Sequence, residues 1–175
     1  TSALEDIAEE FRAAGGAADH RLVFTGDRRQ TIERVATDIE ADALALTGAT
    51  GAVERLLVPL SGDVAVSRVL DFVTTLVGER EIGVTLLATG EEAENRLAEA
   101  AETLDAAGID AETQVSSGNP FDALLDAVPG HDAVVMGEAA PSLSSLLFGD
   151  EPERVAAASV GPVLVVRRPD DSSDE

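Results

Sequence analysis

Apolar and amphipathic stretches alternate between residues 53 and 168. Continuous apolar runs predict buried strands, whereas apolar residues at helical spacing predict helices packed against them. The expected strands are 53–60, 81–89, 110–118, 131–137 and 161–168, and the expected helices are 64–80, 91–107, 119–128 and about 152–159. Strict alternation of strand and helix is typical of a doubly wound α/β domain. The pattern therefore predicts a Rossmann-like fold with a five-stranded parallel sheet.

Local signals mark the ends of two of these helices. Gly108 follows the apolar stripe of 91–107, and a glycine in this place commonly ends a helix. Asn119 and Pro120 precede the next apolar stretch as an N-cap and a first helical residue.

Residues 1–52 resemble part of the same unit. "AEEFRAAGGAADHRLVFTGD", from Ala8, is similar to "AETLDAAGIDAETQVSSGN", from Ala101. The segment therefore reads as a partial α/β repeat of helix, strand, helix and strand, with strands near 20–25 and 43–47. Only residues 49–52 join this repeat to the strand at 53–60, and this link is too short for a parallel crossover. We therefore expect strands 43–47 and 53–60 not to be parallel neighbours.

Composition adds an unusual charge to this picture. The chain has 34 acidic residues against 12 basic ones, a formal net charge of −22, and all the basic residues are arginine. Dense carboxylates keep a protein soluble in strong salt, so we expect a cytoplasmic protein of a halophile. The charge argues against nucleic-acid binding. The absence of lysine and cysteine excludes Walker and Schiff-base lysines, thiolate nucleophiles and disulfides, and no apolar run is long enough for membrane insertion.

Three segments point to one family. They are "VERLLVPLSGD", the helix "NPFDALLDAV", and the closing "DAVVMGEAAPSLSSLLFGDEPERVAAASVGPVLVVRR". Together they resemble the universal stress protein family over residues 53–168. The resemblance implies an ATP site in which a strand-end aspartate holds the nucleoside. It also implies a loop of glycine, two residues, glycine, nine residues, glycine and a hydroxyl residue, whose backbone N–H groups hold phosphates.

The chain departs from that motif at most positions. The corresponding cofactor-binding positions are Leu60, Ser61, Met136, Gly137, Ala140, Gly149 and Asp150. Ser61 replaces the aspartate, Ala140 replaces the second glycine, and Asp150 stands at the hydroxyl position. Only residues 141–148 separate Ala140 from Gly149, one fewer than the motif has. We therefore expect a degenerate site, with no cofactor or with weakly bound ATP.

The other candidate residues have ordinary explanations. His20 and His131 are expected to be loop histidines facing solvent, and Arg28 and Arg29 to be surface cations. "GATG" at 48–51 keeps the spacing of the first two motif glycines, and we interpret it as a relic or a tight turn. Residues 169–175 are expected to be a disordered acidic tail, and no metal-ligand spacing is evident.

The sequence thus favours a non-enzymatic stress or regulatory module that works through association. Two alternatives remain open: an ATP-binding switch of the same family, and a cytoplasmic regulatory domain of a membrane transporter whose membrane part lies upstream. The strand 161–168 is apolar on both faces and is expected at the sheet edge. An exposed apolar edge strand pairs readily with another chain, so we expect a homodimer through this last strand.

Overall fold

The computed structural model of the chain describes residues 2–13, 15–19, 22–46, 51–60, 66–138, 140 and 162–167. The helices are α1 (Ser2–Ala13), α2 (Arg28–Asp38), α3 (Val66–Val77), α4 (Ala93–Ala106) and α5 (Pro120–Ala127). The strands are β1 (Ala43–Leu46), β2 (Arg55–Pro59), β3 (Gly83–Thr89), β4 (Ala111–Ser116), β5 (Ala133–Gly137) and β6 (Val163–Val166). The expected helix near 152–159 and the expected tail lie outside the described residues.

The chain divides into two compact units, Thr1–Glu40 and Ala41–Glu175. The first unit holds α1 and α2. The strand expected near 20–25 is not formed over the described residues 22–25, which lie in an irregular segment. Asp27 caps α2, accepting a hydrogen bond from the backbone N–H of Gln30 at 3.0 Å.

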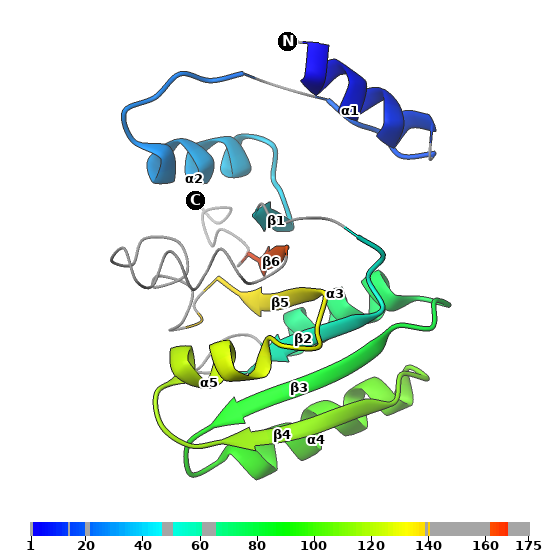
Figure 1. Cartoon of the computed structure of the whole chain (residues 1–175), viewed down its shortest axis with the longest axis vertical. Helices are drawn as coiled ribbons and strands as arrows, with labels where there is room; N and C mark the ends of the chain where they lie inside the picture. The colour runs from blue at the N-terminus through cyan, green and yellow to red at the C-terminus, as the bar shows by residue number, and fades with distance from the viewer. Residues whose placement is uncertain are drawn as a thin grey trace, which may run out of the picture. The chain divides into compact units, whose positions relative to one another are not determined.

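The second unit is built on a six-stranded sheet in the order β1-β6-β5-β2-β3-β4 (Figure 1). The five strands β2 to β6 pair in parallel, which confirms the expected five-stranded parallel sheet. The sixth strand, β1, pairs antiparallel with β6 and is not adjacent to β2. The expectation that 43–47 and 53–60 are not parallel neighbours is therefore confirmed.

The last strand is not at the edge of the sheet, so that expectation was wrong. Residues Ala43 to Leu46 cover its outer side in the register Ala43↔Val166 to Leu46↔Val163. The edges of the described sheet are β1 and β4 instead. An apolar strand such as β6 needs cover on its edge as well as on its faces, and the N-terminal segment supplies it.

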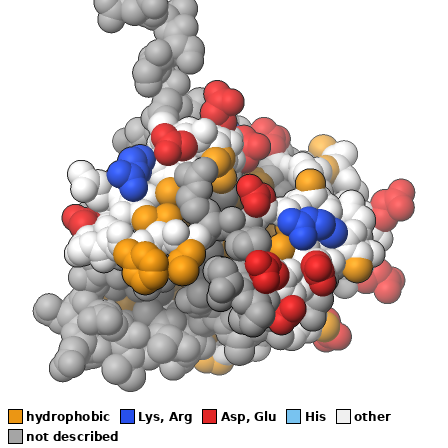
Figure 2. Space-filling model, turned by 90° about the horizontal axis from the view of Figure 1, so that it is seen from above, with side chains coloured by type: hydrophobic (Ala, Val, Ile, Leu, Met, Phe, Trp, Pro, Cys, Tyr) orange, Lys and Arg blue, Asp and Glu red, His pale blue; other side chains and the backbone are white. Residues whose placement is uncertain are grey.

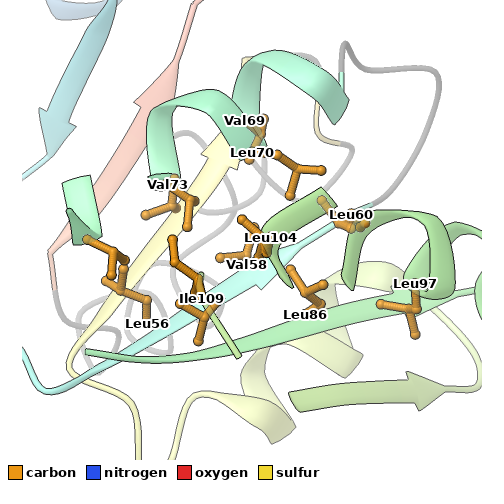
Figure 3. Packing of buried hydrophobic residues seen from close by; sticks show 14 of the residues in the cluster. Leu56, Val58, Leu60, Val69, Leu70, Val73, Leu86, Leu97, Leu104 and Ile109 are labelled. Atoms are coloured by element: carbon orange, nitrogen blue, oxygen red, sulfur yellow. The ribbon is translucent and has the colours of Figure 1, made fainter. Parts of the chain in front are cut away.

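Alternate side chains of the parallel strands face opposite layers, as the two-residue period of a strand requires. Leu56, Val58 and Leu60 of the β2 region join α3 and α4 in the first buried cluster (Figure 3). Leu57 and Val134 join α5 in the second cluster, on the other face. The sheet is therefore covered on both faces, as expected of a doubly wound domain.

The predicted helix ends agree with the structure. Gly108 follows α4 with φ of 81°, a left-handed conformation that glycine adopts without strain. The Asn119 side chain accepts a hydrogen bond from the Phe121 N–H at 2.8 Å, and Pro120 is the first residue of α5. The end of α4 and the start of α5 are therefore determined by residues that can be recognised in the sequence.

His131 and Asp132 fasten the amino end of the sheet. The two ring nitrogens of His131 lie 2.8 Å from the Ala127 carbonyl oxygen and 2.8 Å from Thr85 Oγ1. The imidazole is half-buried, so the expectation of a solvent-facing histidine was wrong. The Asp132 carboxylate accepts hydrogen bonds from the backbone N–H groups of Glu54 and Arg55, each at 2.9 Å, and these bonds lower its pKa.

Replacing Asp132 is expected to produce a pH-dependent loss of stability. Because its folded-state pKa is lowered, the ionised group stabilises the fold above the ordinary aspartate pKa of about 4 and loses that effect as the pH falls through the folded-state value. Asp132→Asn should therefore be less stable than the unmodified chain near pH 6, and the difference should shrink below about pH 4. Melting curves of both proteins between pH 3 and 7 measure this, and a difference that does not change with pH would contradict it.

Candidate functional site

The candidate site lies where the direction of sheet winding reverses. The chain leaves β2 to build β3 and β4 on one side, and then returns to build β5 and β6 on the other. In such sheets ligands bind at the carboxyl ends of the two strands that flank this reversal, which here are β2 and β5. The register Leu56↔Ala133 and Leu57↔Val134, continued along the strands, places Leu60 opposite Gly137.

The structure brings together the candidate residues that it describes. Leu60 follows β2, and Met136 and Gly137 end β5, with Ala140 three residues further on. Leu60 and Met136 are buried, and the Leu60 N–H donates to the Leu87 carbonyl oxygen at 2.7 Å. Ser61, Gly149 and Asp150 lie outside the described residues, so their predicted roles stay predictions.

Ala140 determines the chemistry at the start of the loop. Its side chain is 5% exposed and belongs to the second buried cluster, with Met136 and Val165. Its backbone N–H donates to the Gly137 carbonyl oxygen at 3.0 Å and closes a tight turn. A phosphate-binding loop needs free N–H groups and an open approach to the backbone. At Ala140 the N–H has a partner and the side chain packs into the core.

Two charged residues at this edge were missed by the sequence interpretation. Glu138 directly follows β5 and Arg167 directly follows β6. The Arg167 Nε lies 3.9 Å from Glu138 Oε1, with side chains 10% and 41% exposed. Both could have been found from the rule that residues just after parallel strands line the site. Because the carboxylate lies beside the guanidinium, it offsets the attraction that Arg167 would exert on an anion.

A hollow of about 680 Å³ lies between α3 and α4. Its lining includes the carboxylates of Asp71, Glu92 and Glu99 and the guanidinium of Arg96. Within the described part of the chain, no group of three or more histidine, cysteine, aspartate or glutamate side chains could hold a metal ion.

Carboxylates also dominate the wider surface. In Figure 2, acidic side chains are spread over the visible face rather than gathered at one place. No helix among the described residues is both long and apolar enough to cross a membrane.

Comparison with known proteins agrees with this geometry. The model of the universal stress protein family matches residues 63–167. No curated protein sequence matches the chain significantly. A universal stress protein from Archaeoglobus fulgidus has a similar structure, with a TM-score of 0.67, 20% identity, and coverage of 97% of this chain and 76% of that one.

Two further structures share the fold over about two thirds of this chain. The hypothetical protein MJ0577 has a TM-score of 0.55 and 22% identity, over 69% of this chain and 99% of that one. An Arabidopsis thaliana universal stress protein family protein, with AMP bound, has a TM-score of 0.51 and 14% identity, over 69% of this chain and 95% of that one. At these identities the likeness concerns the fold, whereas the family model covers more than half of the sequence. This chain belongs to the universal stress protein family.

Proposed function

We propose that this chain is a non-enzymatic, cytoplasmic stress or regulatory module of a salt-adapted cell, and that its family nucleotide site binds ATP weakly or not at all. The packing of Ala140 carries this proposal. Its N–H is bonded to Gly137 O, and its Cβ lies in the second buried cluster. To offer this N–H to a phosphate, the turn would have to open and a core contact would be lost.

Charge at the same edge supports the proposal. Glu138 is partly exposed beside Gly137, and the sequence places Asp150 and Glu151 in the same loop. A carboxylate about 4 Å from a phosphate costs about 1–4 kcal/mol, depending on the local dielectric. Two such contacts, at about 2 kcal/mol or more together, would weaken binding by about thirtyfold or more, since about 1.4 kcal/mol corresponds to each tenfold change.

The ring geometry of His131 supports a non-enzymatic function. Both ring nitrogens are within hydrogen-bond distance of protein atoms, so the imidazole serves as a structural bridge between α5 and β3 rather than as a free general base. The sequence also contains no cysteine and no lysine to act as a nucleophile.

The second candidate function is an ATP-binding switch. Gly137 at the end of β5 and the guanidinium of Arg167 nearby favour it, and the Arabidopsis protein of the same fold has AMP bound. The two candidate functions predict different affinities for ATP, since a switch must bind ATP at the concentrations found in cells.

Restoring the motif should restore some binding. We expect the triple variant Ser61→Asp, Ala140→Gly and Asp150→Ser to bind ATP at least tenfold more tightly than the unmodified chain, measured by calorimetry in 2–3 M KCl. Recovery should be partial because the loop remains one residue short. Asp122→Ser repeats the charge change of Asp150→Ser alone, on the exposed first turn of α5, and serves as the control for that substitution. Equal affinities of the triple variant and the control would contradict the assignment of these positions.

A further inference from the structure

β1 is the only described strand that runs antiparallel to its neighbour, and it covers the outer edge of β6. A two-fold axis beside an uncovered β6 would place the β6 of a second copy in the same position and the same antiparallel direction. We propose that β1 acts as an intramolecular edge cap. It occupies the strand position that would otherwise be taken by β6 of a second copy, and so prevents self-association through β6.

The topology permits β1 to reach this position within one chain. Because β1 is antiparallel to β6, Leu46 lies opposite Val163, at the amino end of the parallel strands. Arg55, which begins β2, lies at that same end. The two strands are three spacings apart in the sheet, about 14 Å at the usual 4.8 Å per spacing. The connecting residues 47–54 can extend over roughly 26 Å, so they are long enough to join β1 to β2 within one chain.

Among the described residues, few contacts other than the strand pairing hold β1 in place. Leu44 packs against the second buried cluster, while Ala43 is only half-buried and Ala45 is exposed. The Asp42 carboxylate lies 3.6 Å from the Arg68 guanidinium, and the pair is too exposed to contribute much. The cap therefore depends mainly on a four-residue ladder, which can be weakened without disturbing the parallel sheet.

The hydrogen bonds show which amides depend on the cap. On its β5 side, β6 uses the carbonyls of Pro162 and Val166, which accept from Val134 and Glu138. Since successive residues of a strand face opposite neighbours, Leu164 also faces β5, whereas Val163 and Val165 face β1. The Arg167 N–H donates to the Asp42 carbonyl oxygen at 2.9 Å, in agreement with this alternation.

The same alternation provides a matched pair of variants. Asp42 and Arg167 form a hydrogen-bonded pair, so Leu44 and Val165 form the next one, and Ala45 directs its N–H away from β6. Leu44→Pro removes a donor from the ladder, whereas Ala45→Pro places the same residue where an edge strand tolerates it.

At low protein concentration, where two copies rarely meet, we expect Leu44→Pro in the full chain to show faster hydrogen exchange at the Val165 and Arg167 amides, with the Leu164 and Val166 amides still protected. At higher concentration a second copy should pair with β6, so the mass by light scattering in 2–3 M KCl should become twice that of Ala45→Pro and the protection of Val165 should return. Faster exchange at Val165 in the dilute variant without a gain in mass at higher concentration would overturn the proposal. Unchanged exchange at Val165 in a dilute variant of single-chain mass would overturn it too. If Leu44→Pro unfolded the whole domain, the Leu164 and Val166 amides would also exchange quickly. A pair of cysteines then tests the proposal instead.

That pair is Ala45→Cys with Leu164→Cys. The two residues lie opposite each other at a non-hydrogen-bonded position, where the Cα atoms are close enough for a disulfide, and the chain has no other cysteine. Oxidation should give a cross-linked protein of single-chain size on a non-reducing gel. A cross-linked product of two-chain size would show that β1 pairs with a second copy, and would overturn the intramolecular cap.

Discussion

The melting temperature is expected to fall steeply as the KCl concentration drops below about 1 M. The formal charge of −22 leaves carboxylates repelling one another over much of the surface, and salt screens this repulsion because the Debye length shortens from about 10 Å at 0.1 M to about 3 Å at 1 M. The ion pairs of Arg55 with Glu112 and of Arg68 with Asp42 join exposed side chains and offset little of this repulsion.

A variant with fewer charges separates screening from other effects of salt. Glu94, Glu102 and Asp105 are exposed on α4, and their change to Gln, Gln and Asn should reduce the difference in melting temperature between 0.1 M and 3 M KCl. Scanning calorimetry of both proteins measures it. Equal melting temperatures of the unmodified chain at the two concentrations would argue against salt adaptation.

Leu104→Ala is expected to destabilise the domain by about 2–5 kcal/mol, because it leaves a cavity in a packed core. Leu104 is fully buried in the first cluster, to which Val58 of β2 also belongs (Figure 3). Its loss would therefore weaken the packing of α4 against the strand that leads to the candidate site.

Denaturant unfolding in 2–3 M KCl measures this free energy. Glu102→Ala, on the exposed face of the same helix, should change it by no more than about 0.5 kcal/mol. A Leu104→Ala variant within that range of the unmodified protein would show that the first cluster does not hold α4 in place.

The parallel domain was predictable because its signals are local. Apolar runs marked β2, β3 and β5, and Gly108 and Asn119 marked helix ends whose geometry the structure confirms. The position of β1 was only partly predictable. The short link to β2 excluded a parallel neighbour, but β1 itself has no local feature that selects β6 rather than another edge. That choice depends on the uncovered apolar edge of β6, a property of the assembled sheet.

The candidate site likewise has features that the sequence predicted and features that it did not. The resemblance placed Leu60, Met136, Gly137 and Ala140 together, and the switch between β2 and β5 does bring them to one edge. The pairing of Arg167 with Glu138 was not visible in the sequence. The two residues are 29 positions apart, and they meet only because the strand register places Gly137 opposite Val166. His131 was misjudged for a similar reason, because Thr85, its partner, lies on a distant strand.

We propose that the family nucleotide site binds ATP weakly or not at all, and calorimetric titration of ATP into the full chain in 2–3 M KCl tests this most directly. At that salt concentration the overall negative charge is screened, so the result reports on the loop itself. The packing of Ala140 predicts no binding with a dissociation constant in the micromolar range. A micromolar constant, or ATP found by mass spectrometry in the purified protein, would contradict it.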